Sequence, residues 1–145
     1  MSGKNYSHQL DAKNRMRIPA KFRAELGDGY AITVGSGNCL YVYTAEQMEE
    51  VKKTLTGLNP YRESQLKAAR FVLYNTWVAE EDNQGRILLP DNLRKYAKIE
   101  KNIKVFKGPN CIEIWSEEVW NEYFNDVNFL ELADALDALK NNDRT

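Results

Sequence analysis

An aspartate followed four residues later by an arginine occurs twice in this chain, at Asp11 and Arg15 and again at Asp82 and Arg86. A carboxylate and a guanidinium at this spacing can pair across a tight turn, and the pair holds the guanidinium in one orientation. A fixed guanidinium presents N–H donors that suit phosphate oxygens or the O6 and N7 atoms of guanine. The chemistry that these residues favour is therefore binding.

The residues just before the two arginines, Asn14 and Gly85, support the same turn in both places. Asn and Gly are the residue types that most readily adopt a positive φ. We therefore predict one left-handed residue in each loop. The residues expected to brace the loops are Asp11, Asn14, Asp82 and Gly85.

Each Asp–Arg pair has a simpler interpretation, in which it only stabilises its own turn, because surface ion pairs are common and weak. The surroundings of the first pair favour nucleic-acid binding instead: residues 1–24 contain six Lys or Arg and one Asp, a net charge of 6 − 1 = +5. The second loop has acidic neighbours, so Arg86 contacts DNA weakly or serves folding and assembly. The predicted DNA-binding residues are Lys13, Arg15, Arg17, Lys21, Arg23 and Arg86.

The two loops belong to a longer internal repeat. Asp11, Arg15 and Pro19 return as Asp82, Arg86 and Pro90 at a constant offset of 71 residues, and Cys39 returns as Cys111 at an offset of 72. Repeats of this kind are usually halves of a shared core.

Each copy predicts the same order of elements: a short strand, the loop, a second strand, a short helix with Pro at its first position, a hairpin and a closing helix. Thr44 and Ser116 are the predicted caps of the closing helices, with Gln47 in the capping-box position. The fold class is therefore mostly β with short helices (α+β). The expected units are repeat 1 (5–57), a connecting helix (58–75), repeat 2 (76–125) and an acidic amphipathic C-terminal helix or tail (126–145).

The C-terminal segment has an apolar stripe formed by Phe129, Leu132, Leu136 and Leu139. A helix with such a stripe must cover something apolar. Two interpretations are equally open: the helix packs on its own domain, or it docks between subunits.

Composition excludes several classes of function. The chain has 145 residues, 43% apolar and 28% charged, and no apolar run approaches the roughly 20 residues of a membrane helix, so we expect a cytosolic protein. His8 is the only histidine, which leaves no catalytic pair or metal set to propose. Cys39 and Cys111 flank apolar strand residues and are expected to be buried thiols rather than a disulfide. We expect no enzyme activity, no cofactor and no metal.

The order of four motifs resembles the MraZ family: Gly-x-x-Tyr-x-His-x-Leu-Asp-x-Lys-x-Arg (3–15), Ile-Pro-Ala-Lys-Phe-Arg (18–23), Asp-x-x-Gly-Arg (82–86) and Ile-Glu-Ile-Trp (112–115). The family commonly has Gly where this chain has Asn14. The resemblance implies two AbrB-like (SpoVT-AbrB) swapped-hairpin halves that form one pseudo-dimeric, β-barrel-like core.

The resemblance also implies a function. MraZ proteins are bacterial transcriptional regulators of the cell-division and cell-wall gene cluster, and they form ring-shaped homo-oligomers that bind short G-rich repeats in their own promoter. Double-stranded DNA and a second copy of the chain are thus the expected partners, at a cytoplasmic, nucleoid-associated location. The alternative is a ring-forming scaffold that binds a protein partner and whose loops form subunit interfaces.

Overall fold

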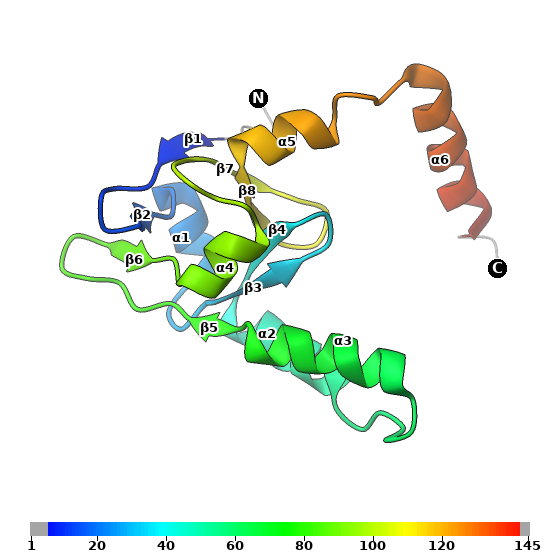
Figure 1. The fold of residues 1–145 in the computed structure, drawn as a ribbon, viewed down its shortest axis with the longest axis horizontal. Coiled ribbons are helices and arrows are strands. Elements are labelled where there is room, and N and C mark those ends of the chain that lie inside the picture. Colours follow the sequence, from blue (N-terminus) through cyan, green and yellow to red (C-terminus); the bar gives the residue numbers. More distant parts are fainter. Residues whose placement is uncertain (1–5, 143–145) are drawn as a thin grey trace.

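A computed structural model describes residues 6–142 (Figure 1). Its strands are β1 (Tyr6–Gln9), β2 (Arg15–Arg17), β3 (Ala31–Gly35), β4 (Cys39–Tyr43), β5 (Trp77–Val78), β6 (Arg86–Leu88), β7 (Asn102–Lys107) and β8 (Ile112–Ser116). Its helices are α1 (Ala20–Leu26), α2 (Ala45–Leu55), α3 (Glu63–Tyr74), α4 (Asp91–Tyr96), α5 (Glu117–Tyr123) and α6 (Phe129–Asn142). No helix within these residues has the length and apolar character needed to span a membrane.

The main sheet is built by exchange of strands between the two repeats. Its order is β1-β7-β8-β4-β3-β5, and every neighbouring pair is antiparallel. The first strand of each repeat thus pairs with the hairpin of the other repeat, and reading the order backwards exchanges the repeats. This arrangement confirms the predicted swapped-hairpin, pseudo-dimeric fold. Within the described residues the sheet stays open, because β1 and β5 are its two edges, so the core is barrel-like without being closed.

A second, two-stranded ribbon lies on the pseudo-twofold axis. β2 and β6 pair antiparallel, with Met16 opposite Ile87, its own counterpart in the other repeat (87 − 16 = 71). These two side chains are buried, so the residues on either side of them face outward. The outward positions of the ribbon are Arg15, Arg17, Arg86 and Leu88.

One hydrophobic core serves both repeats. Equivalent side chains from the two copies are buried in the same cluster, as shown by the pairs Phe22 and Leu93, Ile18 and Leu89, and Val42 and Ile114. Because these pairs share one cluster, each repeat completes the core of the other. The strands that hold the two loops are therefore anchored by the whole chain.

Local capping follows the sequence at the closing helices. The Thr44 side chain accepts a hydrogen bond from the Gln47 backbone N–H, and the Gln47 side chain accepts one from the Thr44 N–H, which completes the predicted capping box. Ser116 Oγ accepts from the Val119 N–H at the start of α5.

The prediction for the prolines was wrong by one residue. Pro19 and Pro90 are the N-cap residues of α1 and α4 rather than their first helical residues, because their ψ angles of 138° and 151° are extended. The Pro19 carbonyl still accepts hydrogen bonds from the backbone N–H groups of Phe22 and Arg23. The helices therefore begin at Ala20 and Asp91.

Both cysteines are buried free thiols, as predicted. Burial raises the pKa of Cys39 and of Cys111 to about 12. A thiol with such a pKa carries almost no thiolate near neutral pH, so neither side chain is a nucleophile.

The pairing of β2 with β6 gives a direct test of the shared core. Ile87 is 1% exposed, whereas its neighbour Leu88 is 59% exposed. We expect Ile87→Ala to lower the free energy of unfolding by about 2–5 kcal/mol, because a buried cavity is left at the axis. The matched control Leu88→Ala should change it by no more than about 0.5 kcal/mol. Urea unfolding followed by circular dichroism, at equal protomer concentration, measures both; equal effects would contradict the assigned register.

Candidate nucleic-acid interface

The first loop is closed by a single carboxylate. Asp11 Oδ1 accepts hydrogen bonds from the backbone N–H groups of Lys13 and Arg15, both at 2.9 Å, and Asp11 Oδ2 accepts from Arg15 Nε at 2.9 Å. Asn14 has a φ of 60°. The predicted Asp–Arg pair and the left-handed residue are thus both present.

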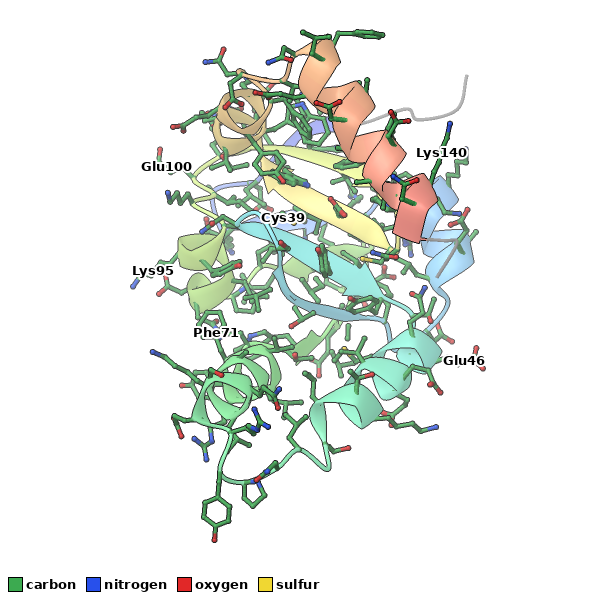
Figure 2. All side chains as sticks on the ribbon, turned by 90° about the vertical axis from the view of Figure 1, so that its right-hand side faces the viewer. Cys39, Glu46, Phe71, Lys95, Glu100 and Lys140 are labelled. Atoms are coloured by element: carbon green, nitrogen blue, oxygen red, sulfur yellow. The ribbon has the colours of Figure 1, made fainter. Side chains whose placement is uncertain are left out.

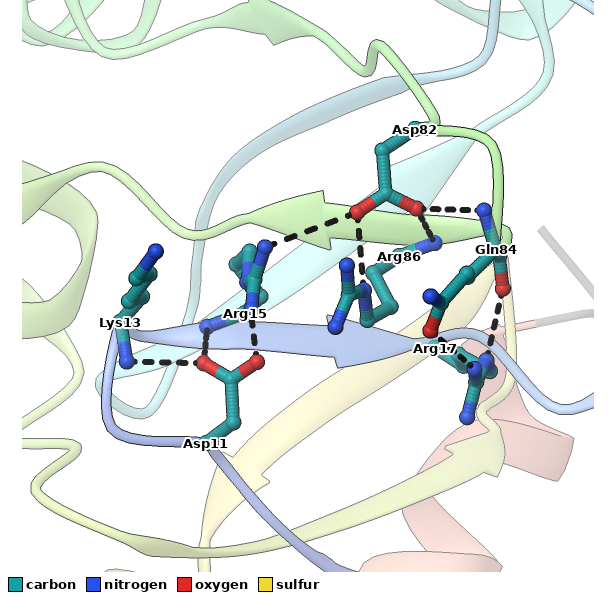
Figure 3. A network of polar contacts seen from close by, with 7 residues as sticks. All are labelled: Asp11, Lys13, Arg15, Arg17, Asp82, Gln84 and Arg86. Atoms are coloured by element: carbon teal, nitrogen blue, oxygen red, sulfur yellow. Dashed lines mark hydrogen bonds and ion pairs between the residues drawn. The ribbon is translucent and has the colours of Figure 1, made fainter.

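The second loop repeats this geometry, as Figure 3 shows. Asp82 Oδ1 accepts from the N–H groups of Gln84 and Arg86 at 2.9 Å, and Asp82 Oδ2 accepts from Arg86 Nε at 2.8 Å. Gly85 has a φ of 74°. One turn chemistry therefore orients an arginine at each end of the ribbon.

The two loops also contact each other. Arg15 Nη1 lies 3.8 Å from Asp82 Oδ2, so Asp82 faces both loop arginines (Figure 3). Arg17 Nε donates to the Gln84 carbonyl oxygen at 2.7 Å. The loops therefore form one surface rather than two separate sites.

Both loop carboxylates are held in the charged state. The pKa of Asp82 is lowered to about 2, first by the backbone N–H of Arg86 and then by that of Gln84 and by the Arg86 side chain. The pKa of Asp11 is lowered chiefly by the backbone N–H of Arg15. The bracing hydrogen bonds are therefore present throughout the physiological pH range.

The two arginines are less exposed than a freely projecting side chain. The side chains of Arg15 and Arg86 are 27% and 26% exposed. Each loop arginine donates to its aspartate through Nε, so the terminal Nη1 and Nη2 groups of the same guanidinium can meet other acceptors. Part of the side-chain entropy that binding would remove is already lost in this geometry.

The other predicted cations fall into two groups. Lys13, Arg17 and Lys21 are exposed and lie on the first loop, on β2 and at the start of α1. Arg23 is instead paired bidentately with Glu81, through Nε at 2.9 Å and Nη2 at 2.7 Å. Its guanidinium also lies against the second loop, since a Cβ atom at Gly85 would be 3.4 Å from Arg23 Nη1. α1 of the first repeat thus supports the loop of the second.

Glu81 is one of the acidic neighbours of the second loop, and its pairing was not predicted from the sequence. Its carboxylate accepts from Arg23 and from the Tyr30 hydroxyl at 2.8 Å, and the Arg23 side chain is the main reason that its pKa is lowered. Glu81 lies in an insertion that the constant offset of 71 concealed. Two equivalent backbone hydrogen bonds, one from each repeat, reveal this insertion. The Leu10 N–H donates to the Lys101 carbonyl, and the Ala79 N–H donates to the Tyr30 carbonyl.

The backbone bonds locate that insertion. The acceptors are 101 − 30 = 71 residues apart, but the donors are only 79 − 10 = 69 apart. The second copy therefore has two additional residues, Glu80 and Glu81, before its loop. The sequence contained a signal for this insertion: Leu10 directly precedes Asp11, whereas Glu80 and Glu81 separate Ala79 from Asp82.

Within residues 6–142, no group of three or more His, Cys, Asp or Glu side chains is placed to hold a metal ion. The arrangement as a whole is a basic ribbon with two braced arginines. Such a surface can bind anions by charge and can contact a base edge by the fork of a guanidinium.

The exchanged strands and the duplicated loops define a protein of the AbrB-like, swapped-hairpin class. A family model described as "MraZ protein, putative antitoxin-like" matches residues 1–65 and 73–142. The chain is 46% identical over 136 residues to "Transcriptional regulator MraZ" of Thermoanaerobacter pseudethanolicus, which covers 92% of this chain and 95% of the relative. Proteins of the same name from Caldanaerobacter subterraneus and Alkaliphilus metalliredigens are 42% and 37% identical over 134 and 136 residues, with at least 91% of this chain and 94% of each relative covered.

The chain therefore belongs to the MraZ family, as the four motifs predicted. These relatives are named as transcriptional regulators and not as enzymes, in agreement with the class expected from the sequence.

The bracing of the second loop can be tested by titration. In the wild type we expect the Asp82 carboxyl to titrate with a pKa of about 2. In Arg86→Met the pKa should rise but stay below its ordinary value of 3.8, because the two backbone N–H donors remain. Since the folded pKa is the lower one, the stability contributed by this carboxylate is present above the unfolded pKa and is lost as pH falls through the folded pKa. Carboxyl ¹³C chemical shifts measure both values; a wild-type pKa at or above 3.8 would contradict the geometry.

Proposed function

We propose that this chain is a sequence-specific DNA-binding regulator of a bacterial cell-division and cell-wall gene cluster. In this proposal it acts as a ring-shaped homo-oligomer in the cytoplasm, associated with the nucleoid, and its loops contact short G-rich repeats in its own promoter region. The observation that carries the proposal is the outward face of the β2–β6 ribbon, where three of the four residues are arginines.

The ribbon is an element of the kind that the major groove of DNA accepts. The major groove of B-DNA is about 12 Å wide and admits a two-stranded antiparallel ribbon. With β2 and β6 in the groove, Arg15 and Arg86 present their Nη groups to base edges, and the bidentate partner of an arginine there is the O6 and N7 pair of guanine. A preference for G-rich DNA follows from two arginines held on the same face of the ribbon.

The surrounding cations supply contacts to the phosphate backbone. Lys13, Arg17 and Lys21 are exposed around the first loop and are the proposed phosphate contacts. Arg23 remains in the proposed interface, although its pairing with Glu81 makes support of the second loop its main contribution. The net charge of −1 does not oppose this function, because the local field at the ribbon decides the approach of DNA.

Repetition of the ribbon in an oligomer explains how so small a contact can be specific. One ribbon contacts few bases, but when one ribbon is bound the next meets its repeat at a high effective concentration. Direct repeats in DNA, spaced to match neighbouring subunits, are the target that this arrangement favours.

Replacement of the loop arginines tests the base contacts. We expect Arg15→Ala and Arg86→Ala each to weaken specific binding roughly 5- to 150-fold, the equivalent of about 1–3 kcal/mol for a bidentate base contact. The oligomer should remain assembled, because the substitutions leave the core intact. Mobility shifts with promoter DNA measure affinity, and sedimentation velocity measures assembly.

Two control variants make this test specific. Lys53→Ala removes one positive charge from the exposed face of α2, far from the ribbon in sequence, and should leave affinity nearly unchanged. Arg15→Lys keeps the charge but removes the fork, and should bind specific DNA about as poorly as Arg15→Ala. Wild-type affinity for promoter DNA in Arg15→Ala would refute the assignment.

Salt dependence separates this function from the scaffold alternative. DNA affinity should fall by roughly 0.9 log units per tenfold increase in salt for each phosphate neutralised. Lys13→Ala should make this salt dependence shallower by about the value for one phosphate contact. A scaffold whose loops form subunit interfaces would instead show little salt dependence, and Arg86→Ala would dissociate it. A salt titration of the mobility shift decides between the two.

A further inference from the structure

Two apolar surfaces of this chain stay exposed, and they lie at opposite ends of the molecule. The α6 stripe consists of Phe129, Leu132, Leu136 and Leu139, which are 46–80% exposed. The α3 patch consists of Phe71, Leu73 and Tyr74, which are 41–81% exposed. α6 lies at the upper end and α3 at the lower end in both Figure 1 and Figure 2. Contiguous exposed apolar residues of this kind mark interaction sites.

The α6 helix needs a partner to be stable. It extends from the body after α5, and its apolar stripe is not covered by the sheet (Figure 1). A helix of 14 residues is marginal in water by itself. The helix is also acidic. One lysine (Lys140) and three acids (Glu131, Asp134 and Asp137) give it a net charge of 1 − 3 = −2. The partner should therefore be apolar at its centre and positive at its rim.

The outer face of α3 has these properties. The inner face of the helix packs on β3 and the core through residues such as Ala69 and Val72. Phe71 also contacts Tyr96, with the ring centroids 5.6 Å apart, but nearly half of it stays exposed beside Leu73 and Tyr74. A shallow groove runs along that outer face, lined by the α3 patch and by Lys67 and Arg70. Arg70 is only loosely paired with Glu63, at 3.8 Å, and both side chains are well exposed.

We propose that α6 of one copy of this chain docks on the α3 patch of a second copy. Leucines of the α6 stripe would cover Phe71 and Tyr74, while the acids of α6 would meet Lys67 and Arg70. This contact rests on the proposed homo-oligomer and names the surfaces that build it. Because each copy offers one stripe and one patch, the contact is heterologous, and subunits joined in this way close into a ring when the rotation between them allows.

A second copy fits better than the α3 patch of the same chain. α5 packs on β7 and β8, whereas α3 packs on β3 on the other side of the sheet centre. Only residues 124–128 join α5 to α6, and five residues span at most about 18 Å when fully extended. α6 lies apart from α3 in both views (Figures 1 and 2).

Two variants test the contact from its two sides. The stripe variant, Leu132→Ser with Leu136→Ser, and the patch variant, Lys67→Glu with Tyr74→Ser, change only side chains that are exposed in the single chain. We expect each to sediment as a monomer under conditions where the wild type is an oligomer. The matched control Leu130→Ser lies on the same helix outside the stripe and should assemble normally. A monomeric wild type, or intact assembly of both variants, would overturn the proposal.

A mixing experiment tests the head-to-tail geometry. The stripe variant still has a wild-type patch, and the patch variant still has a wild-type stripe. An equimolar mixture should therefore form a dimer and nothing larger, although each variant alone is monomeric. Pairing of α6 with α6, or packing of α6 on its own chain, would give no recovery in the mixture and would overturn the proposal.

DNA binding by the same variants keeps this inference separate from the proposed function. The monomeric stripe variant should retain affinity for DNA with one repeat and lose the additional affinity for DNA with several repeats. Recovery of the dimer in the mixture, with no DNA binding by any variant, would support the contact while contradicting the proposed function. A mixture that stays monomeric, together with DNA binding that still depends on the loop arginines, would contradict the contact while supporting the proposed function.

Discussion

The pairing of β2 with β6 is the constraint on which the rest of this molecule depends. These two short strands meet on the pseudo-twofold axis, with Met16 opposite Ile87, and both side chains enter the common core. Because strand side chains alternate, burial of these two residues forces their neighbours outward. The same pairing brings Asp82, from the second repeat, within reach of Arg15 in the first. One buried contact thus orients the whole basic surface.

The two repeats differ in chemical character at exposed positions, whereas the equivalent positions of the shared core stay apolar. Arg17 and Leu88 occupy equivalent outward positions of the ribbon, yet one is a cation and the other is apolar. Arg23 pairs with Glu81, whereas its counterpart Arg94 donates to the Leu89 carbonyl of its own repeat. A duplicated fold therefore presents an asymmetric face, which gives the ribbon a defined direction on any linear partner.

Much of this architecture could be predicted because local chemistry and repetition both point to it. Thr44 with Gln47 predicted a capping box, and Asn14 with Gly85 predicted the left-handed residues, since each feature depends on neighbours in sequence. The role of Glu81 could not be predicted in this way. Its partners Arg23 and Tyr30 lie more than 50 residues away, and only the exchange of strands brings them together. The sequence likewise gave no register for the ribbon, so Leu88 was not recognised as an outward residue.

The exchange of strands also has a consequence for biosynthesis. β1 pairs with β7, and Gln9 lies opposite Asn102. Because Asn102 is added 102 − 9 = 93 residues after Gln9, this pairing cannot form earlier. At synthesis rates of about 5–20 residues per second, the first strand emerges roughly 5–20 s before its partner exists. Until residues 77–78 are added within that interval, the β3–β4 hairpin has neither β5 nor β8 beside it, and its edges are open to other chains. The nascent chain is thus most exposed to misassembly while it is only half made.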